Sequence, residues 1–188
     1  MSEPSPRGVS TREKKRRLFF ALWPAETRQH EIASAMRRRV EASRGRAIPA
    51  ENLHVTLAFV GSVLESRFER VVRCAAEVSG ARFHLELDQI EIWARAHVLC
   101  LTPRRTPPEL AHIAEQLRFR LLSEQFEIRQ EEYRPHMTLA RDVRRRDVRE
   151  PIGAIAWNVD DFVLVESRPG RAGSEYKVIE RWPLSGSC

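Results

Sequence analysis

The stretch HVTLAF, His54 to Phe59, returns later in the chain as HMTLAR, His136 to Arg141. Each copy places one apolar residue between a histidine and a threonine, and each continues with Leu-Ala. Successive side chains of a β-strand point to opposite faces. Each copy therefore predicts a strand with an apolar face for a core and a His-Thr face on the other side. The repeat predicts two related halves that face one another across a cleft.

The segments around the two copies predict a mixed fold. LFFALW, residues 18–23, is typical of a buried strand, and apolar residues at helical spacing predict helices over 26–43, 66–78 and 107–125. Alternating segments predict half-buried antiparallel strands over 83–93, 97–102, 157–167 and 175–184, and residues 126–130 predict another short strand. Because few crossovers are long enough for a parallel sheet, this order favours an α+β fold over a doubly wound one.

The composition is that of a soluble globular protein. The chain has 188 residues, 42% of them apolar, and no run of the roughly 18 apolar residues that a membrane helix needs. Three scattered cysteines predict neither a disulfide framework nor a metal site, which favours the cytoplasm. Residues 1–16 are polar and aperiodic and predict a disordered basic tail before a single domain over 17–188.

The formal charge is +6, and all but three of the 32 basic residues are arginine. Arginine offers a planar fork suited to phosphate, so the charge leaves nucleic-acid binding open. Taken alone, the arginine excess is better explained by a GC-rich coding bias than by function.

The paired His-Thr strands are suited to cleaving a phosphodiester without a metal. An imidazole titrates near neutral pH, so one histidine can remove a proton while its partner supplies one. Thr56 and Thr138 are placed to donate hydrogen bonds to phosphate oxygens. Arg141 would add positive charge, but simple alternation puts it on the opposite face from His136 unless the strand bulges. A single His-x-Thr is usually only strand; the second copy favours function.

The chain resembles the two-histidine phosphoesterase superfamily, and within it the RNA 2′,3′-cyclic phosphodiesterases, also called 2′,5′ RNA ligases. The resemblance rests on RLFFALWP, NLHVTLAFVG, YRPHMTLARDV and FVLVESRPGRAGSEYKVIERWPL. It implies a bilobal α+β fold: two pseudo-symmetric lobes of mainly antiparallel sheet, helices on the outer faces and an active-site cleft between them.

The resemblance also implies hydrolysis of an RNA terminal 2′,3′-cyclic phosphate to a 2′-phosphate. His54 matches the proton donor and His136 the proton acceptor, while Thr56, Thr138 and Arg141 match phosphate-contacting positions. No cofactor or metal is expected, and the reverse reaction, 2′–5′ joining of tRNA halves, is a possible side activity.

The sequence departs from the family in two places. Cys100 stands where the family often has an aromatic residue, and residues 141–149, RDVRRRDVR, are unusually basic. We expect altered packing and a solvated loop, respectively. Trp93 is expected as a core or hairpin-edge aromatic. The remaining histidines are expected on helices (His30, His112) and strands (His84, His97) without a functional role.

Two alternatives remain open. The same histidines would serve a phosphodiesterase for small cyclic nucleotides or 2′–5′ oligonucleotides. The second alternative is a protein that binds RNA ends without cleaving them, although binding alone would not require two titratable groups. A monomer is expected.

Overall fold

A computed structural model describes residues 13–128, 132–144, 152–170 and 173–186. The helices are α1 (Glu26–Ser43), α2 (Phe68–Ala76) and α3 (Pro108–Ser123), with short 3₁₀ turns η1 (Ala50–Asn52) and η2 (Glu65–Arg67). The strands are β1 (Lys15–Leu22), β2 (Arg46–Ala47), β3 (Val55–Leu64), β4 (Phe83–Leu87), β5 (Gln89–Trp93), β6 (Val98–Thr102), β7 (Met137–Arg141), β8 (Ile155–Val159), β9 (Asp161–Gly170) and β10 (Gly173–Pro183).

One large antiparallel sheet organises the molecule, in the order β10-β9-β1-β3-β7-β6-β5, with β2 paired to β7. The strands that carry the two His-x-Thr stretches, β3 and β7, are neighbours at its centre. β4 and β8 form a separate two-stranded sheet. The two halves of the chain therefore meet where the repeated stretches lie side by side.

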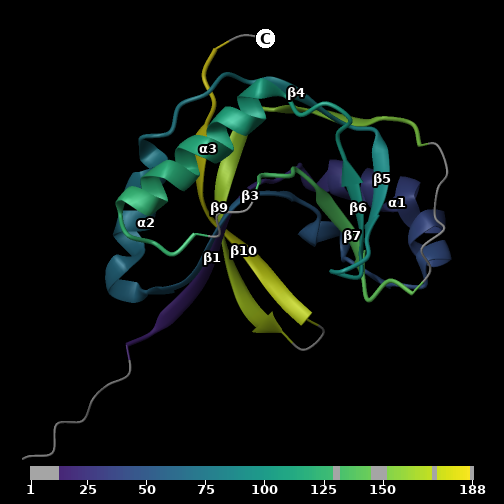
Figure 1. Cartoon of the computed structure of the whole chain (residues 1–188), viewed down its shortest axis with the longest axis horizontal. Helices are drawn as coiled ribbons and strands as arrows, with labels where there is room; N and C mark the ends of the chain where they lie inside the picture. Colours follow the sequence, from purple (N-terminus) through teal and green to yellow (C-terminus); the bar gives the residue numbers. More distant parts are fainter. Residues whose placement is uncertain (1–12, 129–131, 145–151, 171–172, 187–188) are drawn as a thin grey trace, which may run out of the picture.

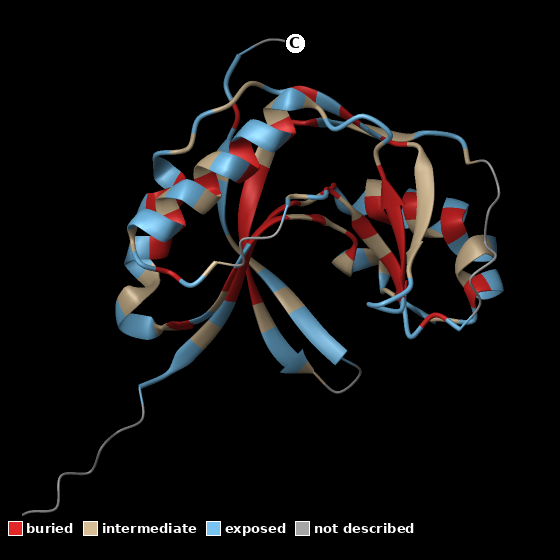
Figure 2. Ribbon diagram, in the orientation of Figure 1, coloured by how far each residue is buried: buried red, intermediate tan, exposed pale blue. Residues whose placement is uncertain are grey.

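The helices divide between the two ends of this sheet (Figure 1). α2 and α3 lie over β3 and its neighbours, whereas α1 lies beside β7. Helix α3 buries Leu110, Ile113, Leu117 and Leu121, and α1 buries Ile32 and Met36. Figure 2 shows the buried residues concentrated in the central strands and on the helix sides that face them. Among the described residues, no helix is long and apolar enough to span a membrane.

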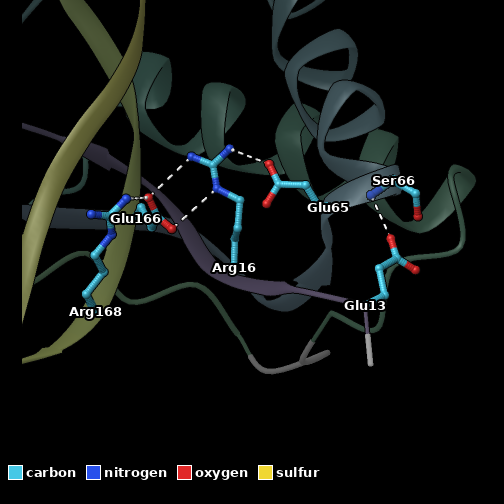
Figure 3. A network of polar contacts seen from close by, with 6 residues as sticks. All are labelled: Glu13, Arg16, Glu65, Ser66, Glu166 and Arg168. Atoms are coloured by element: carbon cyan, nitrogen blue, oxygen red, sulfur yellow. Dashed lines mark hydrogen bonds and ion pairs between the residues drawn. The ribbon is translucent and has the colours of Figure 1, made fainter. Parts of the chain in front are cut away.

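A network of hydrogen bonds and ion pairs links charged side chains of β1 and β9 (Figure 3). The guanidinium of Arg16 donates to both carboxylate oxygens of Glu166, at 3.4 and 3.3 Å, and lies 3.5 Å from the Glu65 carboxylate. Arg168 donates to Glu166 Oε2 at 2.8 Å, the oxygen to which Arg16 Nη2 also donates. Since Glu166 is buried, these bonds are what makes its charge tolerable there.

The predicted α+β fold of mainly antiparallel sheet is confirmed. The two predicted lobes share one continuous sheet and meet at the pair of β3 and β7. Helix α1 has the predicted bounds. Helix α2 is shorter than the predicted 66–78, because it begins at Phe68 and ends at Ala76. The Ser66 amide lies before the helix and donates to the Glu13 carboxylate.

Other predicted elements were wrong in part. Residues 83–93 form two strands, β4 and β5, which belong to different sheets. His97 lies in the turn before β6 with a positive φ of 51°, not in a strand. Residues 126–128 form no strand, and 129–130 lie outside the described residues. Strand β1 starts at Lys15, inside the predicted tail, of which residues 1–12 lie outside the described part.

Candidate active site

The two His-x-Thr stretches present their polar side chains on one face of the sheet. Val55 pairs with Met137 in the antiparallel ladder between β3 and β7. Continuing that register by one residue places His54 level with Thr138 and Thr56 level with His136. The intervening Val55 and Met137 are fully buried in the main core. We call the side that carries the two histidines and the two threonines the histidine face.

Each of these strands bulges just after its threonine. Between β1 and β3, Ala21 pairs with Thr56 but Phe20 pairs with Ala58, which leaves Leu57 as an extra residue. Between β6 and β7, Cys100 pairs with Thr138 but Leu99 pairs with Ala140, which leaves Leu139 as the extra residue. The repeat in the sequence is thus also a repeat of backbone irregularity.

The bulge in β7 changes the face on which Arg141 lies. An extra residue in one strand reverses the alternation of all side chains beyond it. Arg141 therefore joins Thr138 on the histidine face instead of pointing into the core. It is exposed there, and its charge acts on both histidines. In β3 the equivalent bulge brings Phe59 to the same face, where its ring lies 5.9 Å from that of Phe19.

His54 is held by its backbone and by aromatic rings. Its Nδ1 lies 2.7 Å from the Asn52 carbonyl oxygen and its Nε2 lies 3.2 Å from Thr56 Oγ1. Because a carbonyl only accepts, Nδ1 carries the proton of the neutral ring, and the unprotonated Nε2 accepts from the Thr56 hydroxyl. Three rings surround the imidazole, with centroid distances of 5.0 Å for Phe19, 5.1 Å for the stacked Trp23 and 5.4 Å for Tyr176.

His136 repeats the backbone anchor but has a more polar setting. Its Nδ1 donates to the Arg134 carbonyl oxygen at 2.8 Å, so its Nε2 is also unprotonated in the neutral ring. The Trp93 ring packs against the imidazole with a centroid distance of 4.3 Å. The Arg134 guanidinium lies over the Trp93 indole, with its central carbon 4.9 Å from the ring centre.

Burial lowers the pKa of both histidines. The pKa of His54 falls to about 4, chiefly through loss of solvation, and the charges of His136 and Arg141 lower it further despite the bond to Asn52. The pKa of His136 is also lowered, first by burial and then by Arg134 and Arg141, while the Arg134 carbonyl and Glu91 act in the opposite direction. Both rings are therefore neutral at pH 7 when no anion is bound.

Residues beneath the site hold the two strands in place. Tyr133, in the segment before β7, donates its hydroxyl hydrogen to the Thr56 carbonyl oxygen at 3.2 Å. Cys100 is fully buried, with Sγ 4.0 Å from Thr138 Oγ1. Burial raises the pKa of the Cys100 thiol to about 12, so it stays protonated and packs as an apolar group.

The structure brings all five predicted site residues, His54, His136, Thr56, Thr138 and Arg141, to one face. Sequence reasoning missed most of the residues that surround them. Of the aromatic neighbours it singled out Trp93, as a core or hairpin-edge aromatic, and this ring packs on His136. The missed neighbours are Phe19, Trp23, Glu91, Arg134 and Tyr176. Of the basic segment 141–149, residues 145–149 lie outside the described part.

A cavity of about 320 Å³ borders the site but does not contain it. Trp23, which stacks on His54, also lines this cavity together with Arg28 of α1 and Trp157 of β8. Neither histidine lines it. Within the described ranges, no group of three or more His, Cys, Asp or Glu side chains is arranged to hold a metal ion.

Comparison with known proteins places this geometry in a family. The family model described as the 2′-5′ RNA ligase superfamily matches residues 24–171, a span that contains both His-x-Thr strands. The chain belongs to this superfamily. The predicted relationship is thereby confirmed. A curated relative, the RNA 2′,3′-cyclic phosphodiesterase of Escherichia coli K12, is 32% identical over 172 residues, which cover 90% of this chain and 97% of the relative.

Solved structures of the superfamily share the whole architecture. The crystal structure of E. coli LigT in complex with 3′-AMP matches with a TM-score of 0.86 at 29% identity, covering 92% of this chain and all of that one. The apo form of the same protein matches with a TM-score of 0.84 at 30% identity, covering 92% and 99%. A Thermus thermophilus structure at 23% identity has a TM-score of 0.77, covers 92% and 100%, and is a likeness of fold.

Proposed function

We propose that this protein hydrolyses the 2′,3′-cyclic phosphate at the end of an RNA strand to a 2′-phosphomonoester. The predicted enzyme class, an RNA 2′,3′-cyclic phosphodiesterase, is confirmed at the level of the relationship to the E. coli enzyme. The observation that carries the proposal for this chain is the pair of imidazoles on one face, each with Nδ1 bonded to a backbone carbonyl and Nε2 left unprotonated in the neutral ring.

The two Nε2 atoms are suited to the two proton transfers of the reaction. Nε2 of His136 takes a proton from water as the water oxygen bonds to phosphorus. The bond from phosphorus to the 3′ oxygen breaks, and Nε2–H of His54 gives that oxygen a proton. The products are a 2′-phosphomonoester and a free 3′ hydroxyl, and the two histidines exchange protons with solvent before the next turnover.

The remaining site residues stabilise the charge on phosphate. The hydroxyls of Thr56 and Thr138 lie level with the opposite histidines and donate to the non-bridging oxygens, where negative charge increases in the transition state. Arg141, turned to this face by the bulge at Leu139, supplies a permanent positive charge.

The lowered pKa values make proton uptake part of substrate binding. With both rings neutral in the free protein, one must gain a proton before it can act as the acid. A phosphodiester anion between them favours the charged form and raises both pKa values. The two rings interact, so they titrate as a pair.

Three further points belong to this proposal. With the 5′ hydroxyl of a second RNA in place of water, the same groups would join RNA ends: the 5′ oxygen bonds to phosphorus, the bond to the 3′ oxygen breaks, and the product is the 2′–5′ bond that the superfamily description names. A small cyclic nucleotide or a 2′–5′ oligonucleotide would use the same groups. A protein that only binds RNA ends would not require two titratable Nε2 atoms. We place the enzyme in the cytoplasm as a monomer that needs no cofactor, and RNA ends as its partners.

The test is turnover of a short RNA ending in a 2′,3′-cyclic phosphate, in excess EDTA, with the product isomer identified. We expect a 2′-phosphate at an unchanged rate. A 3′-phosphate would reverse which oxygen leaves. Complete loss of activity that Mn²⁺ or Zn²⁺ restores would place the chemistry on a metal. Turnover of cyclic mononucleotides but not of RNA would favour the small-nucleotide alternative.

A further inference from the structure

A carboxylate beside His136 has no role in the reaction described above. Glu91 lies on β5 opposite Cys100, and Cys100 in turn contacts Thr138. Its Oε1 accepts a hydrogen bond from Thr102 Oγ1 at 3.0 Å. Its Oε2 accepts two more, from Trp93 Nε1 at 2.8 Å and from Arg134 Nη2 at 3.0 Å. About a third of the side chain remains exposed.

Two of these three donors are the residues that hold the His136 ring. Trp93 packs against the imidazole, and the Arg134 carbonyl accepts the Nδ1 proton. Arg134 also lies over the Trp93 indole. One carboxylate thus fixes the indole edge and the guanidinium at once, while Thr102 fixes the carboxylate. Loss of Glu91 would release the indole that packs on the His136 ring and the guanidinium that lies over that indole.

The setting of His54 differs in this respect. The groups in contact with that ring are aromatic side chains, a backbone carbonyl and a hydroxyl. The charges that act on His136 come from Arg134 and Arg141 of its own segment and from Glu91 of β5. His54, just before β3, interacts with it as well. Among these described groups, Glu91 supplies the negative charge opposite two arginines.

We propose that Glu91 is the positioning residue of His136: it orients the imidazole through Trp93 and Arg134 and makes the two histidines of the pair chemically unequal. The carboxylate stabilises the protonated form of His136, the form that follows proton abstraction from water. This inference rests on the proposed role of His136 as the base.

The variants that test it are Glu91→Gln and Glu91→Ala, with Glu86→Gln as the matched control. Glu86 is an exposed glutamate on β4, near His84. In Glu91→Gln, an amide oxygen still accepts from Trp93 or Thr102 but the charge is lost. The first readout is the titration of His136 by NMR in the substrate-free protein. We expect the His136 pKa to fall in Glu91→Gln and to stay unchanged in Glu86→Gln.

The second readout is the pH profile of kcat/KM for the cyclic-phosphate RNA. We expect the acidic limb to move to lower pH in Glu91→Gln, because the base stays neutral there. We expect kcat to fall about tenfold in Glu91→Ala, a fraction of what a general base contributes. A weaker effect is expected in Glu91→Gln, because the amide preserves part of the scaffold.

An unchanged His136 titration in a folded Glu91→Gln would overturn the proposal. So would a Glu91→Ala whose loss of activity merely follows its loss of thermal stability, with the pH profile in place. The titration needs no turnover, so it separates this inference from the proposed function: a wild-type protein inactive on cyclic phosphate would contradict only the function.

Discussion

At the level of single residues, the proposed reaction depends on two imidazoles. Their surroundings differ, but each is bonded to a backbone carbonyl. Each donates Nδ1–H to the carbonyl two residues before it, so each offers Nε2 to the same space. The strand geometry alone produces this equivalence, because the same His-x-Thr-Leu-Ala segment meets its own copy in an antiparallel pair.

In the proposed mechanism, replacing either histidine removes one proton transfer. We expect His54→Ala and His136→Ala each to lower kcat by about 10²- to 10⁴-fold, the usual contribution of a general acid or base. Folding should persist, since both side chains lie outside the main core. The control is His112→Ala, an exposed histidine on α3. Near-full activity in either folded variant at the site would rule out the two-histidine mechanism.

Binding of an anion should reverse the effect of burial on His54. In the free protein its pKa is lowered to about 4. We expect inorganic phosphate, used as a substrate analogue, to raise this pKa, because the anion favours the imidazolium. An NMR titration of the histidine ring protons with and without phosphate measures it. A titration of His54 that phosphate leaves in place would mean that the anion does not bind beside it.

At the scale of elements, the bulges decide which side chains the strands deliver. Alternation along a straight strand predicts Arg141 on the core side, and the extra residue Leu139 turns it to the histidine face. We expect Arg141→Ala to lower kcat/KM about 10- to 100-fold, the value of a charged hydrogen bond to phosphate. Arg38→Ala, at an exposed position on α1, is the control. Equal kcat/KM in the two variants would mean that Arg141 makes no contact with the phosphate.

The turn between α1 and β2 supports the same end of β7. A Cβ added at Gly45 would lie 2.9 Å from the Arg141 carbonyl oxygen and 3.1 Å from the Ala140 Cβ. We expect Gly45→Ala to lower the free energy of unfolding by about 1–3 kcal/mol and to reduce kcat/KM, because β7 must move to relieve the overlap. Gly153→Ala, where an added Cβ meets nothing within 4 Å, is the control. The two variants are compared by thermal unfolding and by kinetics; identical behaviour would show that the strand end is not constrained.

Helices and strands were predictable where their hydrophobic periodicity was strong. They were not predictable where the pairing partner of a strand determined the sheet to which it belongs. The alternation in β3 and β7 and the spacing in α1 and α3 follow directly from sequence. Residues 83–93 read as one alternating run, yet β4 and β5 join different sheets because β4 finds its partner in β8. Trp23 and Tyr176 reach His54 only through the fold, since they are far from it in the chain and belong to no shared pattern. The two bulges have no sequence signal of their own; each simply follows the threonine of a repeated His-x-Thr stretch.

At the scale of the whole molecule, buried titratable groups tie stability to pH. His54 binds its proton more weakly in the folded chain than in the unfolded one, so stability falls as pH drops from about 6.5 toward 4. Burial alone would raise the pKa of Glu166, but its bonds to Arg168 and Arg16 outweigh this and the pKa is lowered. The stability from Glu166 is therefore present above its unfolded pKa and lost on further acidification.

The lowered pKa of His54 predicts a melting temperature that decreases from about pH 6.5 to pH 4, and the lowered pKa of Glu166 predicts a further decrease at more acidic pH. We expect His54→Gln to flatten the decrease between about pH 6.5 and 4, because the neutral amide gains no proton in either state. Exposed His112→Gln serves as the control. Thermal unfolding at a series of pH values measures it, and an unaltered slope in His54→Gln would mean that His54 titrates normally in the folded protein.

In the proposed mechanism, His54 and His136 move two different protons in one reaction. The most direct measurement uses a ribonucleotide 2′,3′-cyclic phosphate in which sulphur replaces the 3′ bridging oxygen. A thiolate leaves without help because a thiol has a pKa of about 8.5, so it needs no general acid. We predict that this substrate restores most of the activity of His54→Ala and none of that of His136→Ala. Restoration of His136→Ala instead, or of neither variant, would contradict the assignment.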